Sequence, residues 1–355
     1  MSVRYIGSKA RVADAICDLA EPPSGGRFVD AFCGTGSVAA AAATRGWRVT
    51  LNDSLPSAVA MSVGATVSRG NVRFEALGGY TSAIETLNDV PGQPGFIYRE
   101  YSPASATNGG VERRYFTEGN AARLDAMRAQ IRAWSNAGDL EWAEEQLLLA
   151  DLIQAANRSA NIAGTYGCFL KKWSATALRP VRVHARPLPV GVRDIEAKVG
   201  DVYDLSTTSE DTVYFDPPYT KRQYSAYYHV LETLHAGDAP EVGGVTGLRP
   251  WKDRASDFCY KTQALDALTR LVLGTTARQI LLSYSSEGHV PQERLVNALS
   301  EAGRVTLHEV MTIGRYRPNA QAAAGVGTVD EYVVEINPVR LDQESLNSQR
   351  AGIFA

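Results

Sequence analysis

The chain has 355 residues, of which 45% are apolar and 21% charged, and this is the composition of an ordinary globular protein. Its apolar runs are too short to span a membrane, its first residues show no signal-peptide pattern, and its four cysteines lack the spacing of a zinc site or a disulfide framework. A formal net charge of −3 argues, if the charge is evenly spread, against a nucleic-acid-binding protein. We therefore expect a cytoplasmic protein with no bound metal.

The first part of the chain predicts the opening of a parallel α/β sheet, because strand and helix patterns alternate there. Ser8 is placed to cap a helix, and Gly46 to end one. The predicted elements are a helix at 9–19, a strand at 28–32, a tight turn at 33–36, a helix at 37–44 and a strand at 47–51.

The pattern changes after about residue 70 and returns near residue 195. Between these points the sequence predicts loops, including one at 102–110, and two helices, one through Leu124 and Trp134 and one that starts at Asp139. Further on, the expected elements are strands at 198–202, 212–215 and 279–283, helices at 228–234 and 262–273, a helix between Pro291 and Gly303, and a closing strand pair at 305–313 and 331–336. This predicts a discontinuous domain at 1–70 and 195–340, an insert at 71–194, and a tail at 341–355.

A glycine-rich turn runs from Asp30 to Ser37, and Asp53 lies nineteen residues after Gly34. Glycines let the backbone approach a ligand closely at the end of a strand, and an acid at the end of the next strand can bind ribose hydroxyls. The spacing also satisfies a loose dinucleotide fingerprint, and a plain tight turn would look similar. The turn alone therefore indicates a nucleotide-like ligand without identifying it.

A second motif, Asp216-Pro217-Pro218-Tyr219, directly follows the apolar strand at 212–215. It suits methylation of an amino group conjugated to a ring, whose lone pair is delocalised and weakly nucleophilic. Asp216 and the carbonyl of Pro217 can accept the amino N–H bonds, and Tyr219 can stack on the ring. We therefore predict Asp216, Pro217, Pro218 and Tyr219 as the catalytic residues.

Together with the N-terminal segment Arg4 to Lys9, these two motifs resemble, in sequence and in order, the Dam-like (alpha-group) adenine-specific DNA methyltransferases. The resemblance covers about 1–60 and 195–337. It implies the class I S-adenosylmethionine (AdoMet) methyltransferase fold, an α/β Rossmann-like mixed sheet with a C-terminal antiparallel strand pair. The insert at 71–194 would then be a mostly helical target-recognition region.

The resemblance also implies the cofactor site. Tyr5 and Lys9 would lie at the AdoMet pocket, the glycine-rich turn around the methionine end, Asp53 at the ribose and Asp201 at the cofactor adenine. The full set of implied AdoMet-binding residues is Tyr5, Lys9, Asp30, Phe32, Cys33, Gly34, Gly36, Ser37, Asp53, Asp201 and Asp216. The implied reaction is methyl transfer to N6 of an adenine flipped out of double-stranded DNA, with S-adenosylhomocysteine (AdoHcy) as product.

Other functions fit the sequence less well. A dehydrogenase leaves the motif at 216–219 unexplained, and a cytosine-C5 methyltransferase needs a Pro-Cys nucleophile that the sequence lacks. Cytosine-N4 methylation is chemically close, although such enzymes more often carry serine in place of Asp216. That reaction and a catalytically inactive DNA-binding regulator of the same fold stay open as alternatives.

The net charge conceals a basic segment. Residues 152–193 contain no Asp or Glu and seven cations, so the rest of the chain carries −10. This segment interleaves glycine, aromatic and basic residues, a composition suited to phosphate contacts. The predicted DNA-binding residues are Arg158, Lys171, Lys172, Arg179, Arg182 and, beyond the segment, Arg222. The expected partner is double-stranded DNA, bound by a monomer. Segments 222–225 and 231–233 resemble restriction-modification members of the class, which leaves a companion endonuclease open.

Overall fold

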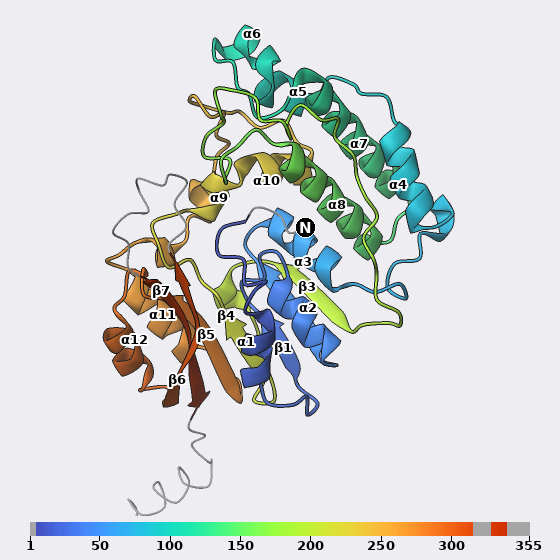
Figure 1. Ribbon diagram of the computed structural model, residues 1–355. Helices are drawn as coiled ribbons and strands as arrows, with labels where there is room; N and C mark the ends of the chain where they lie inside the picture. The colour runs from blue at the N-terminus through green and yellow to red at the C-terminus, as the bar shows by residue number, and fades with distance from the viewer. Residues whose placement is uncertain (1–4, 315–327, 339–355) are drawn as a thin grey trace, which may run out of the picture.

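A seven-stranded mixed sheet forms the base of the molecule in the computed structural model, which describes residues 5–314 and 328–338. The strand order is β3-β2-β1-β4-β5-β7-β6 (Figure 1). The first five strands in this order are parallel, and β7 is antiparallel to both of its neighbours. The strands are β1 Arg27–Asp30, β2 Arg48–Asp53, β3 Ile195–Val199, β4 Thr212–Phe215, β5 Gln279–Ser285, β6 Gly303–Gly314 and β7 Thr328–Pro338. This arrangement confirms the predicted class I methyltransferase fold.

Side chains of the central strands alternate between two cores. Phe28 and Tyr214 face one core, while Val29 and Val213 face the other, as the period of two along a strand requires. The first core contains residues of α1 Ala13–Leu19, α2 Ser37–Thr44 and α3 Pro56–Thr66, and the second contains residues of α11 Ala264–Leu273 and α12 Gln292–Leu299. Both faces of the parallel part of the sheet are thus covered.

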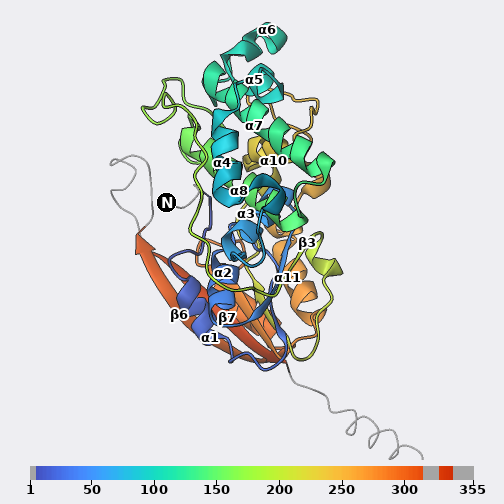
Figure 2. The ribbon, with the colours of Figure 1, turned by 90° about the vertical axis from the view of Figure 1, so that its right-hand side faces the viewer.

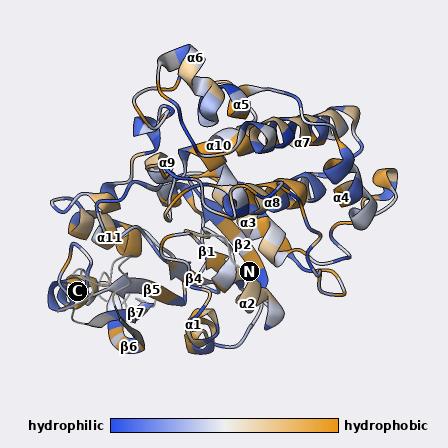
Figure 3. Cartoon of the chain, turned by 45° about the horizontal axis from the view of Figure 1, so that its top comes forward, coloured by the Kyte–Doolittle hydropathy of each residue, from blue (hydrophilic) through white to orange (hydrophobic). Residues whose placement is uncertain are grey.

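A layer of helices stands above the sheet, as Figures 1 and 2 show. It contains α4 Tyr80–Asp89, α5 Phe96–Tyr101, α6 Ala106–Gly109, α7 Glu118–Ala137, α8 Trp142–Ser159, α9 Tyr224–Tyr227 and α10 His229–Ala236. Helices α3 and α8 lie next to each other (Figure 3) and pack against each other with most of their residues buried, so they join the layer to the sheet. Short 3₁₀ helices occur at Glu75–Leu77, Pro103–Ser105, Val202–Asp204, Lys252–Arg254 and Asp257–Cys259.

Three of the predicted element boundaries were wrong at their N-terminal side, and one of them is that of α8, which begins at Trp142 instead of Asp139. Helix α1 begins at Ala13 instead of residue 9, and Ser8 does not cap it. Gly7 has a φ of +72°, and the Lys9 side chain is directed to an ion pair, so the chain turns before the helix starts. The strand expected at 198–202 is β3, three residues earlier, because its parallel ladder with β2 ends where Val199 meets Asp53.

Two further expectations are corrected. Gly303 does not end a helix: α12 stops at Leu299, and Gly303 opens β6 opposite Pro338. The segment 102–110, expected as loop, contains a 3₁₀ helix and the short helix α6. The tail predicted at 341–355 lies outside the described residues. The domain boundaries stay a prediction, and α9 and α10 come from outside the predicted insert although they lie in the helical layer.

Within the described part of the chain, no helix combines the length and the apolar character needed to cross a membrane.

Candidate active site

The glycine-rich turn leaves the end of β1 and leads into α2. Gly34 and Gly36 have φ values of +49° and +77°, a backbone conformation that glycine adopts at little cost. A Cβ on Gly36 would lie 2.6 Å from Cα of Ser62, so α3 also requires glycine at this position. The small residues Ala39 and Ala42 of α2 are fully buried, which lets this helix lie close to the sheet.

Asp53, at the end of β2, stands beside this turn. Its carboxylate accepts the N–H of Gly34 at 3.1 Å and the N–H of Leu55 at 3.0 Å. Burial raises the pKa of Asp53 to about 6, against the lowering effect of these backbone hydrogen bonds. The two turns after β1 and β2 are therefore tied together by one carboxylate, at the edge of the sheet where the parallel strands end.

The turn at 216–219 follows β4 at the same edge. Oδ1 of Asp216 lies 2.9 Å from Nζ of Lys9, and the two side chains are 15% and 6% exposed. Burial raises the pKa of Asp216, and the Lys9 ammonium opposes that rise. For Lys9, burial lowers the pKa, but the ion pair with Asp216 outweighs burial and the pKa of Lys9 is raised. Nζ of Lys9 also lies 5.5 Å from the ring centre of Tyr219, within the range of a cation–π contact.

Aromatic side chains hold the N-terminal segment in place. The ring of Tyr5 stacks on Tyr228 at a centroid distance of 4.3 Å. The N–H of Ile6 donates to Oη of Tyr228 at 2.6 Å, and Oη of Tyr224 donates to the carbonyl of Ile6 at 3.1 Å. Tyr224 and Tyr228 thus position the segment that carries Lys9.

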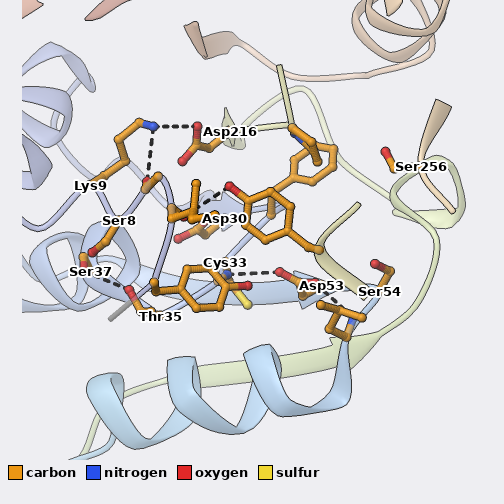
Figure 4. A pocket seen from close by; sticks show the side chains of 18 of the residues that line it. Ser8, Lys9, Asp30, Cys33, Thr35, Ser37, Asp53, Ser54, Asp216 and Ser256 are labelled. Carbon is orange, nitrogen blue, oxygen red and sulfur yellow. Dashed lines mark hydrogen bonds and ion pairs between the residues drawn. The ribbon is translucent and has the colours of Figure 1, made fainter. Parts of the chain in front are cut away.

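These elements enclose a cavity that contains about 780 Å³ of space, including its open mouth (Figure 4). Nine of the predicted cofactor residues line it, namely Tyr5, Lys9, Asp30, Phe32, Cys33, Gly34, Ser37, Asp53 and Asp216. Gly36 does not line the cavity; it lies on the side of the turn that faces Ser62 of α3. Asp201 lines a second cavity of about 910 Å³, which shares Phe32 and Ser54 with the first. Of the predicted catalytic residues, Pro218 also lines the first cavity, whereas Pro217 is buried and Tyr219 lies next to Lys9.

Part of the lining was not predicted from the sequence. Arg254 and Ser256 line both cavities and come from the segment between α10 and α11. Gln223 and Ser225 lie in the segment at 222–225 whose resemblance was weak. The sequence around Arg254 carries no motif, so its place at the site could be found only from the structure.

The chemistry of the cavity suits a cationic ligand with a nucleoside part. Asp30 is 1% exposed, its Oδ1 has no hydrogen-bond partner, and burial together with the charge of Asp216 raises its pKa to about 8. A buried carboxyl of this kind gains most from a positive charge placed beside it. AdoMet carries a sulfonium and an ammonium group, and Oδ1 of Asn52, also buried without a partner, adds an acceptor at the second cavity. The residues present therefore fit AdoMet.

The predicted DNA-binding residues fall into two groups. Lys171, Lys172, Arg179, Arg182 and Arg222 are exposed. Arg158 is only partly exposed, and burial lowers its pKa.

Two other cations of the basic segment are used inside the protein. Arg186 forms an ion pair with the buried Asp151, and Arg193 donates to the carbonyl of Thr66 at 2.8 Å. Less of the segment's charge therefore faces solvent than the sequence indicates, and its role in DNA binding stays a prediction. Among the described residues, no group of three or more His, Cys, Asp or Glu side chains could hold a metal ion.

The sheet order and the acid-rich cavity at the carboxyl ends of its strands define a class I methyltransferase fold. The chain belongs to the D12 class N6 adenine-specific DNA methyltransferase family, whose family model matches residues 5–297. This confirms the resemblance that the motifs predicted.

Individual relatives are similar at about the same level. The type II methyltransferase M.FokI of Planomicrobium okeanokoites is 31% identical over 94% of this chain and 52% of its own length. M.NlaIII of Neisseria lactamica is 31% identical over 81% of this chain and 84% of its own length. M.CviAII of Paramecium bursaria Chlorella virus 1 is 30% identical over 93% and 97%. The chain thus spans about half the length of M.FokI and nearly all of M.CviAII.

Proposed function

We propose that this chain transfers a methyl group from AdoMet to N6 of an adenine that has been flipped out of double-stranded DNA. The observation that carries the proposal is the position of the Asp216-Pro217-Pro218-Tyr219 turn. The carboxylate of Asp216 lines the acid-rich cavity and pairs with Lys9. The family description and the names of the relatives, which are type II methyltransferases and modification methylases, support it.

The proposed cofactor residues divide along the two cavities. Asp30 and the glycine-rich turn would hold the methionine part, Asp53 the ribose, and Asp201 the adenine, with Tyr5 and Phe32 as apolar walls. When bound, AdoMet supplies an electrophilic methyl group on a sulfonium. The buried carboxylates would favour binding of this cationic group.

The residues of the catalytic turn act on the target amino group. A carboxylate has several acceptor positions, so the ion pair with Lys9 leaves room at Asp216 for an N–H of the adenine. With the Pro217 carbonyl as a second acceptor, the amino group is oriented and its lone pair is drawn out of conjugation with the ring. Tyr219, packed edge-on against Tyr284 at 5.7 Å, offers a face on which the base can stack. Catalysis is then mainly positioning and electrostatic.

DNA would bind across the cleft between the sheet domain and the helical layer, with residues 71–194 as the target-recognition region. The exposed Lys171, Lys172, Arg179, Arg182 and Arg222 are the proposed phosphate contacts. Flipping the base costs roughly a few kcal/mol, which contacts to the displaced nucleotide must offset. We expect a monomer on DNA, and a companion restriction endonuclease is consistent with the relatives' names.

The test is transfer of a radiolabelled methyl group from AdoMet to unmethylated DNA of many sequence contexts, followed by mass spectrometry of the nucleosides. Wild type should produce N6-methyladenine. Asp216→Ala should lose turnover but bind AdoMet, and Asp53→Ala should bind AdoMet more weakly. N4-methylcytosine as the product would replace the proposal by the cytosine alternative. No transfer by wild type, together with retained DNA binding, would favour an inactive regulator.

A further inference from the structure

Arg254 stands where two cavities meet. It lines both the cavity that contains Asp53 and the cavity that contains Asp201. Ser256 lines both as well, from the same wall segment, which we define as residues 251–258. Figure 4 shows Ser256 of this wall segment and Asp53 on the strand side of the first cavity. A ligand that extends from one cavity into the other lies beside the four residues that line both, namely Phe32, Ser54, Arg254 and Ser256.

The guanidinium of Arg254 is held in place by a buried acid. Nη1 of Arg254 donates to Oε2 of Glu232 at 3.0 Å, and the two side chains are 39% and 5% exposed. Oε1 of Glu232 accepts the backbone N–H of Ser57 at 3.0 Å. Both oxygens of Glu232 are therefore engaged, and the acid fixes the direction in which the arginine points. Because the guanidinium has five N–H donors, this pairing leaves donors for a ligand.

The same short stretch of chain positions Asp53 and Glu232. Leu55 donates its N–H to Asp53, and Ser57, two residues later, donates to Glu232. Asp53, an acceptor, and Arg254, a donor, thus line the same cavity. The stretch from Leu55 to Ser57 positions Asp53 directly and Arg254 through Glu232. Ribose hydroxyls both donate and accept hydrogen bonds, and adenine ring nitrogens accept them, so a nucleoside fits this pair.

The wall segment is also tied to the region that follows the catalytic turn. The side-chain amide of Gln223 pairs with both backbone groups of Ser256: its Oε1 accepts the N–H at 2.9 Å, and its Nε2 donates to the carbonyl at 3.2 Å. Oγ of Ser225 donates to the carbonyl of Arg254 at 3.4 Å. These hydrogen bonds fix the backbone of the wall segment, so its residues are a stable part of the cavity lining.

From this geometry we infer that Arg254 is a further cofactor-binding residue, which donates hydrogen bonds to the nucleoside half of AdoMet, and that Glu232 is the residue that positions it. The inference rests on the proposed function, because it assumes that AdoMet occupies the two cavities. It makes a claim that a purely structural ion pair would not: affinity for the nucleoside must depend on the arginine.

The experiment is titration calorimetry with two ligands, AdoHcy and 5′-deoxy-5′-methylthioadenosine, which keeps the nucleoside and lacks the amino-acid part. Arg254→Ala should weaken both ligands by the same factor, about tenfold or more, as expected for the loss of a charged hydrogen bond. Glu232→Gln keeps the shape of the side chain and removes its charge, so it should weaken both ligands less. Arg254→Lys should retain part of the affinity. Arg249→Ala is the matched control, since Arg249 pairs with Asp238 at 2.8 Å just before the wall segment and lines neither of the two cavities. It should bind both ligands as wild type does.

Three results would overturn the inference. The first is unchanged affinity in Arg254→Ala. The second is a loss for AdoHcy alone, which would assign the arginine to the carboxylate. The third is an equal loss in Arg249→Ala, which would mean that only the packing of the wall segment matters. If Arg254→Ala fails to fold, as its melting temperature would show, Arg254→Lys and Glu232→Gln still decide. Failure of wild type to bind AdoHcy would reject the proposed function itself and the inference with it.

Discussion

Lys9 offers the sharpest test of how the catalytic turn works. Its ammonium lies 2.9 Å from Asp216, and both side chains are largely buried. A positive charge at this distance lowers the pKa of a carboxyl group by about 1–3 units. One unit corresponds to 1.36 kcal/mol, so Lys9 favours the ionised form of Asp216 by about 1.4–4 kcal/mol. Without Lys9, burial would keep the carboxyl protonated to a higher pH.

Replacing Lys9 by Met should therefore change the pH dependence of methyl transfer. In the proposed mechanism Asp216 accepts the amino N–H bonds as a carboxylate, so activity should be lost as the pH falls through its pKa. The acid limb of kcat should move upward by about 1–3 pH units in Lys9→Met, and activity should recover in part at alkaline pH. The assay is transfer of tritiated methyl groups to unmethylated phage DNA at AdoMet concentrations that saturate each variant. Lys9→Arg, which keeps the charge, should leave the limb near its wild-type position.

A uniform loss of rate in Lys9→Met with an unmoved acid limb would refute this reasoning. Lys9 would then act on AdoMet or on the base directly, and its pairing with Asp216 would be incidental to catalysis.

Three other predictions follow from the site and the surface. AdoMet should favour the ionised form of Asp30, because burial and Asp216 raise the pKa of this carboxyl to about 8. Binding at pH 7 should then release a proton, and AdoMet should bind more tightly as the pH rises to about 8. Calorimetry in two buffers should detect this proton release, and Asp30→Asn should abolish it. Gly36→Ala should lower the free energy of unfolding by about 1–2 kcal/mol or more, visible as a lower melting temperature, because φ is +77° and the new Cβ would clash with Ser62. Lys171→Ala with Lys172→Ala should flatten the slope of log K for DNA against log salt by about 0.9 per lost phosphate contact, whereas Arg193→Ala, whose side chain bonds Thr66 inside the protein, should not.

The buried strands were predictable because they are marked by local sequence. β4 is an apolar run ended by Asp216-Pro217, and its bounds match the prediction. β3, Ile195–Val199, does alternate apolar and charged residues, but it is an edge strand in which no side chain is fully buried, so its position was not marked by an apolar run as that of β4 is. Its register is set by the ladder with β2, a contact between segments about 150 residues apart that the local sequence does not encode.

The same distinction explains which site residues were found. The glycine-rich turn and the turn at 216–219 are contiguous motifs whose chemistry can be interpreted in place. Glu232 and Arg254 come together only because α10 packs against α3 while the wall segment returns across the cavity. Glu232 lies in the segment 231–233, whose resemblance gave it no role at the cavity, and Arg254 has no neighbouring motif; a Glu in a helix or an Arg in a loop is ordinarily a surface residue. Tertiary packing therefore supplied the part of the lining that comes from α10 and the wall segment.

Part of the acidity behind the net charge of −3 comes from residues at the two cavities. Asp30, Asp53, Asp216 and Glu232 lie in or beside the cofactor cavities, where burial raises the pKa of each. Some of the acidity counted in the sequence thus lies at the site proposed for a cationic cofactor, where burial favours the protonated form of each carboxyl group. The exposed cations near Lys171 lie in a segment that contains no Asp or Glu. Because interactions between exposed charges are screened beyond about 10 Å at 0.1 M salt, DNA responds to the charges nearest to it. An acidic total is therefore compatible with the proposed DNA surface, in which the cavity acids would serve the cofactor and the exposed cations the DNA.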